Sequence, residues 1–92
     1  MSSLHTISKA PSQGQLDQCL SFLGQHDGVL FIEDGVYYCL EQLDLPEVDV
    51  FSLKEDMSAR GIAGRNRTTA KPVNYEEFVE LCCQYDKVVS WF

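Results

Sequence analysis

Four cysteines, Cys19, Cys39, Cys82 and Cys83, are the residues of this 92-residue sequence that could support sulfur chemistry. The thiolate is the reactive form of cysteine, and its formation at neutral pH requires a helix N-terminus or a nearby cation. No Cys-x-x-Cys pair is present, and the adjacent Cys82 and Cys83 suit neither a disulfide nor a zinc site. We therefore expect reduced thiols, no structural metal and no cofactor.

Helical periodicity places three of the four cysteines on apolar stripes. Cys19 recurs with leucines at the spacing i, i+3, i+4, i+7, and Cys39 and Cys82 stand in the same pattern further along the chain. The leucines that share the stripe of Cys19 are Leu16, Leu20 and Leu23. This spacing is typical of small core residues, so packing is the first interpretation of these thiols.

The first helix also has a predicted start. Ser12 and Gln15 have the Ser-x-x-Gln spacing of a capping box, which predicts that the helix begins at Ser12. Cys19 then lies in the second turn, where the field of the helix N-terminus has faded. A reactive thiol remains the alternative to core packing for Cys19.

Composition limits the class of protein. An apolar share of 45% and an aromatic share of 11% indicate one globular domain, residues 1–92, with a thin core. The N-terminal residues lack the pattern of a secretory signal, so we expect a cytoplasmic protein. A net charge of −7 argues against general nucleic-acid binding, which requires a cationic surface.

One segment is basic on this acidic chain. Residues 57–75 contain no acidic side chain, and they hold Arg60, Arg65, Arg67 and Lys71, four of the seven basic residues. The segment is either a solvated loop or a contact surface for an acidic partner or RNA. Trp91 and Phe92 could add an apolar anchor to such a surface.

Short apolar runs alternate with helical patterns of about ten residues, which is typical of a wound α/β fold. Strands are predicted at 4–8, 28–34, 48–53, 70–73 and 88–92. Pro72 restricts the fourth strand to an edge of the sheet. Helices are predicted from Ser12, at 36–43, at 54–60 ending before Gly61, and at 74–85, where Asn74 and Glu77 form a capping box. We expect a single small three-layer α/β/α domain with a mostly parallel sheet.

Other kinds of active site find little support. The turns after the predicted strands contain no glycine-rich phosphate loop. His5 and His26 have no spacing typical of metal ligands, and Asp34 is interpreted as a helix cap. The residues alone predict a small α/β domain without an evident active site.

The order of the motifs nevertheless resembles the TusB/DsrH family of sulfur-relay subunits over essentially the whole chain. The shared stretches are HTISKAP, EDGVYYCL, LKEDMSARGIAG, VNYEEFVEL and a near-terminal Trp91. The resemblance implies a compact α/β fold with a parallel sheet. It also implies two homologous partners, TusC/DsrF-like and TusD/DsrE-like, in a hexamer that passes persulfide sulfur to a small TusE/DsrC-like carrier.

The resemblance further implies that this chain is the non-catalytic member of the three. In the catalytic homologue the acceptor cysteine lies near the start of a helix ending in Arg-Gly, and the comparable segment LKEDMSARG contains no cysteine. The sulfur would end as 2-thiouridine at the wobble position of tRNA, with tRNA contacted only indirectly. The alternative is a DsrH-type subunit of cytoplasmic sulfur oxidation with Cys19 as accessory persulfide acceptor.

Overall fold

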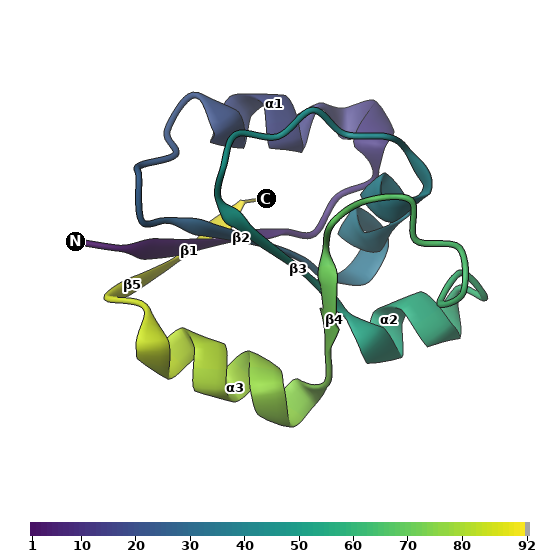
Figure 1. Cartoon of the computed structure of the whole chain (residues 1–92). Helices are drawn as coiled ribbons and strands as arrows, with labels where there is room; N and C mark the ends of the chain where they lie inside the picture. Colours follow the sequence, from purple (N-terminus) through teal and green to yellow (C-terminus); the bar gives the residue numbers. More distant parts are fainter. Residues whose placement is uncertain (92) are drawn as a thin grey trace.

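The computed structural model describes residues 1–91, which form one five-stranded sheet with helices on both faces (Figure 1). The strands are β1 (Ser3–Ile7), β2 (Gly28–Phe31), β3 (Asp49–Leu53), β4 (Lys71–Val73) and β5 (Lys87–Trp91). The α-helices are α1 (Gln15–Leu20), α2 (Lys54–Ala59) and α3 (Tyr75–Gln84). Two 3₁₀ helices are η1 (Pro11–Gln13) and η2 (Glu33–Leu40).

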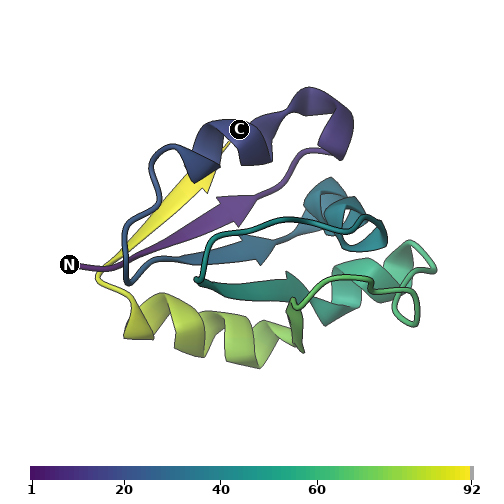
Figure 2. The same ribbon diagram turned by 45° about the horizontal axis from the view of Figure 1, so that its top comes forward.

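The sheet order is β4-β3-β2-β1-β5, and every pair of neighbouring strands is parallel. Helix α3 covers one face of the sheet, while α1 and η2 lie on the other (Figures 1 and 2). The expected three-layer α/β/α arrangement with a mostly parallel sheet is confirmed. The central strand β2 is buried along its whole length, as its unbroken apolar run predicts.

Two apolar clusters hold the layers together. The larger cluster joins α1, η2 and α2 to the sheet and contains Phe31, Val36 and Met57, all with 1% exposure or less. The smaller cluster lies under α3 and contains Leu4, Leu30 and Leu53. Side chains on successive residues of a strand point to opposite faces, which is why β1 and β2 contribute to both clusters.

Several local predictions are confirmed. The side chain of Asn74 accepts the N–H of Glu77 at 2.8 Å, and the Glu77 carboxylate accepts the N–H of Asn74 at 3.0 Å, which completes the capping box of α3. Strand β4, with Pro72, lies at an edge of the sheet. Gly61, which follows the C-cap residue Arg60 of α2, has φ 69°, in the left-handed region that favours glycine at a helix end.

The predicted capping box at Ser12 is wrong. The side-chain oxygen of Gln15 instead accepts the backbone N–H groups of Ser8 and Lys9, at 3.1 and 3.2 Å, and so fastens the turn that follows β1. Residues 11–13 form a separate 3₁₀ turn, and Gly14, with φ 67°, redirects the chain into α1. Helix α1 is therefore shorter than predicted.

The second predicted helix also differs. It is a 3₁₀ helix that begins at Glu33 and ends at Leu40, because the chain turns sharply after β2 with Glu33 at φ 49°. The Glu33 N–H donates to Oδ2 of Asp56 at 2.6 Å, which holds this uncommon backbone conformation. Asp34 does not cap the helix, since its carboxylate accepts hydrogen bonds from Arg60.

Candidate functional site

Cys19 lies in α1 with no exposed surface, inside the larger apolar cluster. Burial, together with the negative charge of Asp27, raises the pKa of its thiol to about 11. Leu20 and Leu23 pack against the same cluster, so the predicted apolar stripe is confirmed. In this arrangement the sulfur is a protonated thiol without access to a reaction partner.

Of the other three thiols, two are also shielded from solvent and one is exposed. Burial raises the pKa of Cys39, which has no exposed surface, although the nearby hydroxyl groups of Thr68 and Ser52 oppose the shift. Cys82 is half-buried against the smaller cluster, and burial again raises its pKa. Cys83 is exposed on α3. Helix α2, the segment that resembles the acceptor helix of the catalytic homologue, carries no cysteine.

The side chain of Arg60 is engaged within the chain. Its Nε and Nη2 donate to Oδ1 of Asp34 at 3.1 and 2.9 Å, and its Nη1 donates to the backbone carbonyl of Asp56 at 3.2 Å. The guanidinium carbon lies 6.0 Å from the centre of the Tyr37 ring. The hydrogen bonds with Asp34 raise the pKa of Arg60. Arg60 therefore joins the end of α2 to the start of η2, and only part of its cationic group faces solvent.

Arg65 and Arg67 are exposed on the loop between α2 and β4, which lies beyond α2 in Figure 1. The loop backbone is held in place, because the Arg67 N–H donates to the Cys39 carbonyl at 2.7 Å. Its side chains add a second hold: the Asn66 amide donates to the carbonyl of Ala70 at 2.9 Å. The two arginines are thus presented from an anchored loop rather than from a free one.

Trp91, at the end of β5, makes contacts that the sequence did not indicate. Its indole N–H donates to Nδ1 of His5 at 3.1 Å, and its ring lies 5.7 Å from that of Phe22. Phe22 is 69% exposed, so this aromatic pair sits at the surface. Phe92, the second predicted anchor, lies outside the described residues.

His5 links Trp91 to Asp27. An indole N–H can only donate, so Nδ1 of His5 accepts and Nε2 carries the proton that it donates to Oδ2 of Asp27 at 3.0 Å. His5 is 4% exposed and both ring nitrogens are occupied. The arrangement lacks the free imidazole nitrogen that general-base catalysis requires, and it serves to fasten three segments together.

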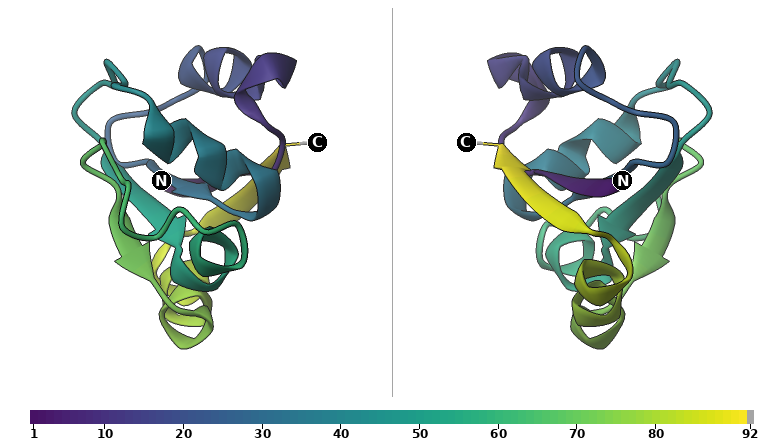
Figure 3. Two further views of the ribbon diagram at one scale, coloured as in Figure 1. Left: turned by 90° about the vertical axis from the view of Figure 1, so that its right-hand side faces the viewer. Right: turned by 90° about the vertical axis from the view of Figure 1, so that its left-hand side faces the viewer.

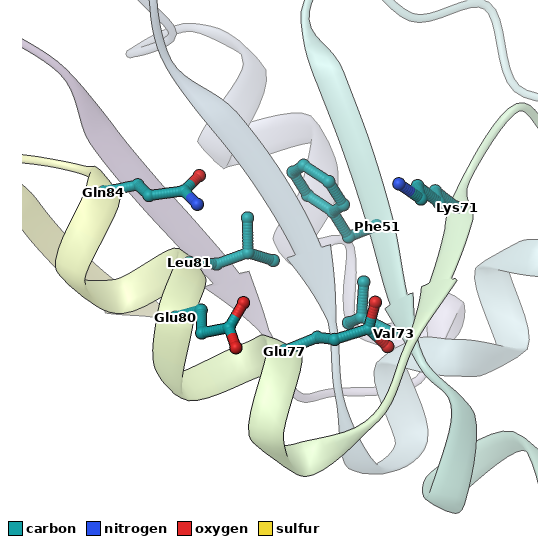
Figure 4. Close-up of a pocket in the computed structure, with 7 residues that line it drawn as sticks. All are labelled: Phe51, Lys71, Val73, Glu77, Glu80, Leu81 and Gln84. Carbon is teal, nitrogen blue, oxygen red and sulfur yellow. The ribbon is translucent and has the colours of Figure 1, made fainter.

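A groove of about 240 Å³ lies between α3 and the β3–β4 side of the sheet (Figure 4). Phe51, Val73 and Leu81 form apolar lining, and Lys71 stands across from carboxylates of α3. The polar side chains from α3 are Glu77, Glu80 and Gln84. The groove contains no cysteine or histidine, so it offers no group for sulfur transfer, and sequence reasoning did not anticipate it.

Within residues 1–91 no group of three or more His, Cys, Asp or Glu side chains is arranged to hold a metal ion. None of the helices in this same range has the length and apolar character needed to cross a bilayer.

Comparison with known proteins gives a consistent result. Residues 9–88 match the family of DsrH-like proteins. The chain is 35% identical to Protein TusB of Enterobacter sp. (strain 638) and 31% identical to Protein TusB of Escherichia coli O1:K1 / APEC. Both alignments cover 96% of this chain and 99% of the relative.

The fold has a solved counterpart as well. The solution NMR structure of Protein Tm0979 from Thermotoga maritima superposes with a TM-score of 0.74 and covers 89% of this chain and 92% of that chain. The two sequences are 23% identical, so the likeness concerns the fold.

Proposed function

Because this chain belongs to the DsrH-like family, we propose that it is a non-catalytic subunit of a sulfur-relay complex, with its single domain spanning residues 1–92. The complex would be cytoplasmic and would contain two homologous subunits, which pass persulfide sulfur to a small carrier protein. The observation that carries this assignment is the state of Cys19, whose buried thiol has its pKa raised to about 11. A sulfur acceptor requires an accessible thiolate.

The absence of a cysteine from α2 supports the same conclusion. Helix α2 begins directly at the end of β3, and the carboxyl ends of parallel strands are where such sheets hold their reacting groups. In this chain that position carries Lys54, Glu55 and Asp56. Asp56 accepts a hydrogen bond from the backbone of Glu33, and Arg60 pairs with Asp34. The segment LKEDMSARG therefore connects α2 to the start of η2 in this chain.

We favour the branch in which the sulfur reaches the wobble uridine of tRNA, since the relatives of high similarity carry the name TusB. The second candidate is a DsrH-type subunit of sulfur oxidation with Cys19 as accessory acceptor. It is kept because the family match is to DsrH-like proteins. For Cys19 to accept sulfur in that role, α1 would have to move away from the sheet.

The partner surface that we propose consists of Arg65 and Arg67, with Arg60 at the start of their loop, and of Trp91 and Phe92 at the C-terminus as an apolar anchor. The exposed arginines stand on an otherwise acidic protein, which favours an acidic surface on the partner. Changing both Arg65 and Arg67 to Glu should weaken assembly, with the larger effect at low salt, where exposed charges are least screened.

The test is coexpression with the two homologous subunits followed by native mass spectrometry. We expect a stoichiometric complex. A cysteine desulfurase should transfer sulfur to a cysteine of another subunit, and this chain should remain unmodified. The matched variant is Cys19→Ala, which should leave sulfur transfer intact. A persulfide mapped to Cys19, with transfer lost in Cys19→Ala, would establish the accessory-acceptor role instead.

A further inference from the structure

The two edges of the sheet differ in how well they are protected. Strand β4 has three residues, begins with the exposed Lys71 and contains Pro72, all of which discourage the addition of another strand. Strand β5 has five residues and no proline, and among residues 1–91 no strand pairs with its outer side. The right-hand view of Figure 3 faces this edge of the sheet and shows β5 in front of the other strands.

The outer side of β5 presents a defined set of backbone groups. The N–H of Lys87 donates to the carbonyl of Ser2 at 3.1 Å, and the parallel register pairs Leu4 with Val88. In a parallel ladder alternate residues of a strand bond to the same neighbour. The residues of β5 that bond toward β1 are Lys87, Val89 and Trp91. The N–H and C=O groups of Val88 and Ser90 therefore point outward.

Apolar side chains flank this edge on both faces of the sheet. Val88 shares the face of Leu4, on the side of α3, and is 43% exposed. On the opposite face, the ring of Trp91 packs against that of Phe22, which is 69% exposed. Exposed apolar surface beside unpaired strand groups is typical of an association site rather than of a free edge.

We propose that β5 pairs in antiparallel orientation with β5 of a second copy of this chain, about a two-fold axis that passes through Val89. The two sheets then form one continuous sheet. In this register Val88 lies opposite the second copy's Ser90, and each such pair exchanges two backbone hydrogen bonds. All the outward donors and acceptors of Val88 and Ser90 are satisfied.

The choice of a second copy as the occupant rests on the self-complementary order of side chains in β5. Val89 faces the second copy's Val89, and pairs of β-branched residues are favourable across strands. Lys87 faces the second copy's Trp91, so a cation meets an aromatic ring and no like charges stand opposite each other. A two-fold axis through Val88 or Ser90 pairs fewer residues of the five-residue strand.

Sedimentation velocity of the purified full chain over a range of concentrations tests this proposal without any sulfur chemistry. We expect a dimer that dissociates on dilution. Ser90→Pro removes an outward N–H and no hydrogen bond of the monomer, so it should give a folded monomer by circular dichroism and sedimentation. The matched control Ser90→Ala keeps that N–H and should stay dimeric.

A charge-pair experiment checks the register itself. Val89→Lys and Val89→Glu each place like charges opposite each other, so each variant alone should be monomeric, and an equimolar mixture should restore the dimer. A monomeric wild-type chain, or a dimer that persists in Ser90→Pro, overturns the proposal. Neither outcome bears on the relay assignment, which coexpression with the homologous subunits tests separately.

Discussion

Asp27 and His5 form a partly buried hydrogen bond of 3.0 Å between Oδ2 and Nε2, at the end of the sheet where β1 and β2 begin. The same carboxylate accepts the N–H of Ser3 at 2.8 Å and that of Gly24 at 2.9 Å. Through the other nitrogen of His5, Trp91 is tied to this group. One carboxylate thus connects the first strand, the loop before the second and the end of the last.

The stability of the protein should depend on the ionisation of Asp27. Burial by itself would raise the pKa of this carboxyl, but the hydrogen bonds from Gly24, His5 and Ser3 lower it below its usual 3.8. A lowered folded-state pKa contributes stability at pH values above the unfolded pKa, and this stability is lost as the pH falls through the folded pKa. We expect the denaturant midpoint to fall as the pH is lowered below about 4.

Asp27→Asn is the matched variant for this prediction. An amide cannot accept all three hydrogen bonds, so the free energy of unfolding at neutral pH should fall by about 1–3 kcal/mol. The part of the acid dependence that comes from Asp27 should disappear with it. An unchanged pH profile in Asp27→Asn would show that other carboxyls cause the acid sensitivity.

Trp91→Phe isolates the indole hydrogen bond from the aromatic contact. The phenyl ring can still pack on Phe22, but Nδ1 of the buried His5 loses its donor. We expect a loss of about 1–2 kcal/mol in the free energy of unfolding. Far-UV circular dichroism should monitor this unfolding, because the variant lacks the tryptophan needed for a fluorescence signal. Phe22→Leu, which removes only an exposed ring, should cost less than Trp91→Phe.

Gly35 should tolerate no side chain. A Cβ at this position would lie 1.9 Å from the carbonyl oxygen of Ile7, which is backbone and cannot swing aside. Gly35→Ala should destabilise the protein by at least about 3 kcal/mol or prevent folding. Gly64→Ala is the control, because a Cβ there meets nothing within 4 Å. This substitution should change the free energy of unfolding, measured by thermal denaturation, by no more than about 1 kcal/mol.

The four thiols should differ widely in their rate of reaction with a thiol reagent. Cys83 is exposed and should react first, Cys82 more slowly, and Cys19 and Cys39 only when the protein opens. Mass spectrometry of a time course under native conditions measures this order. Rapid labelling of Cys19 in the folded chain would contradict the packing described here.

Cys19→Ala should lower the free energy of unfolding by about 1–2 kcal/mol through a small cavity.

Local signals in the sequence were sufficient for much of the fold. The apolar run of β2, Pro72 at the edge and the capping box of Asn74 each act over a few residues, and each appears as predicted. The helix after β2 was placed too late, because its start depends on the close approach of Gly35 to Ile7 and on the Asp56 side chain. Those contacts come from other elements of the fold.

The amino-acid sequence by itself determined the α/β class, the family and the apolar stripe of Cys19, since periodicity and motif order are properties of the chain alone. Only the tertiary structure decided that Arg60 is engaged with Asp34 and that Asp27, His5 and Trp91 form one hydrogen-bonded group. It also decided which edge of the sheet is left open. The physical reason is that pairing between parallel strands brings together residues far apart in sequence. Local sequence patterns do not predict which strands pair.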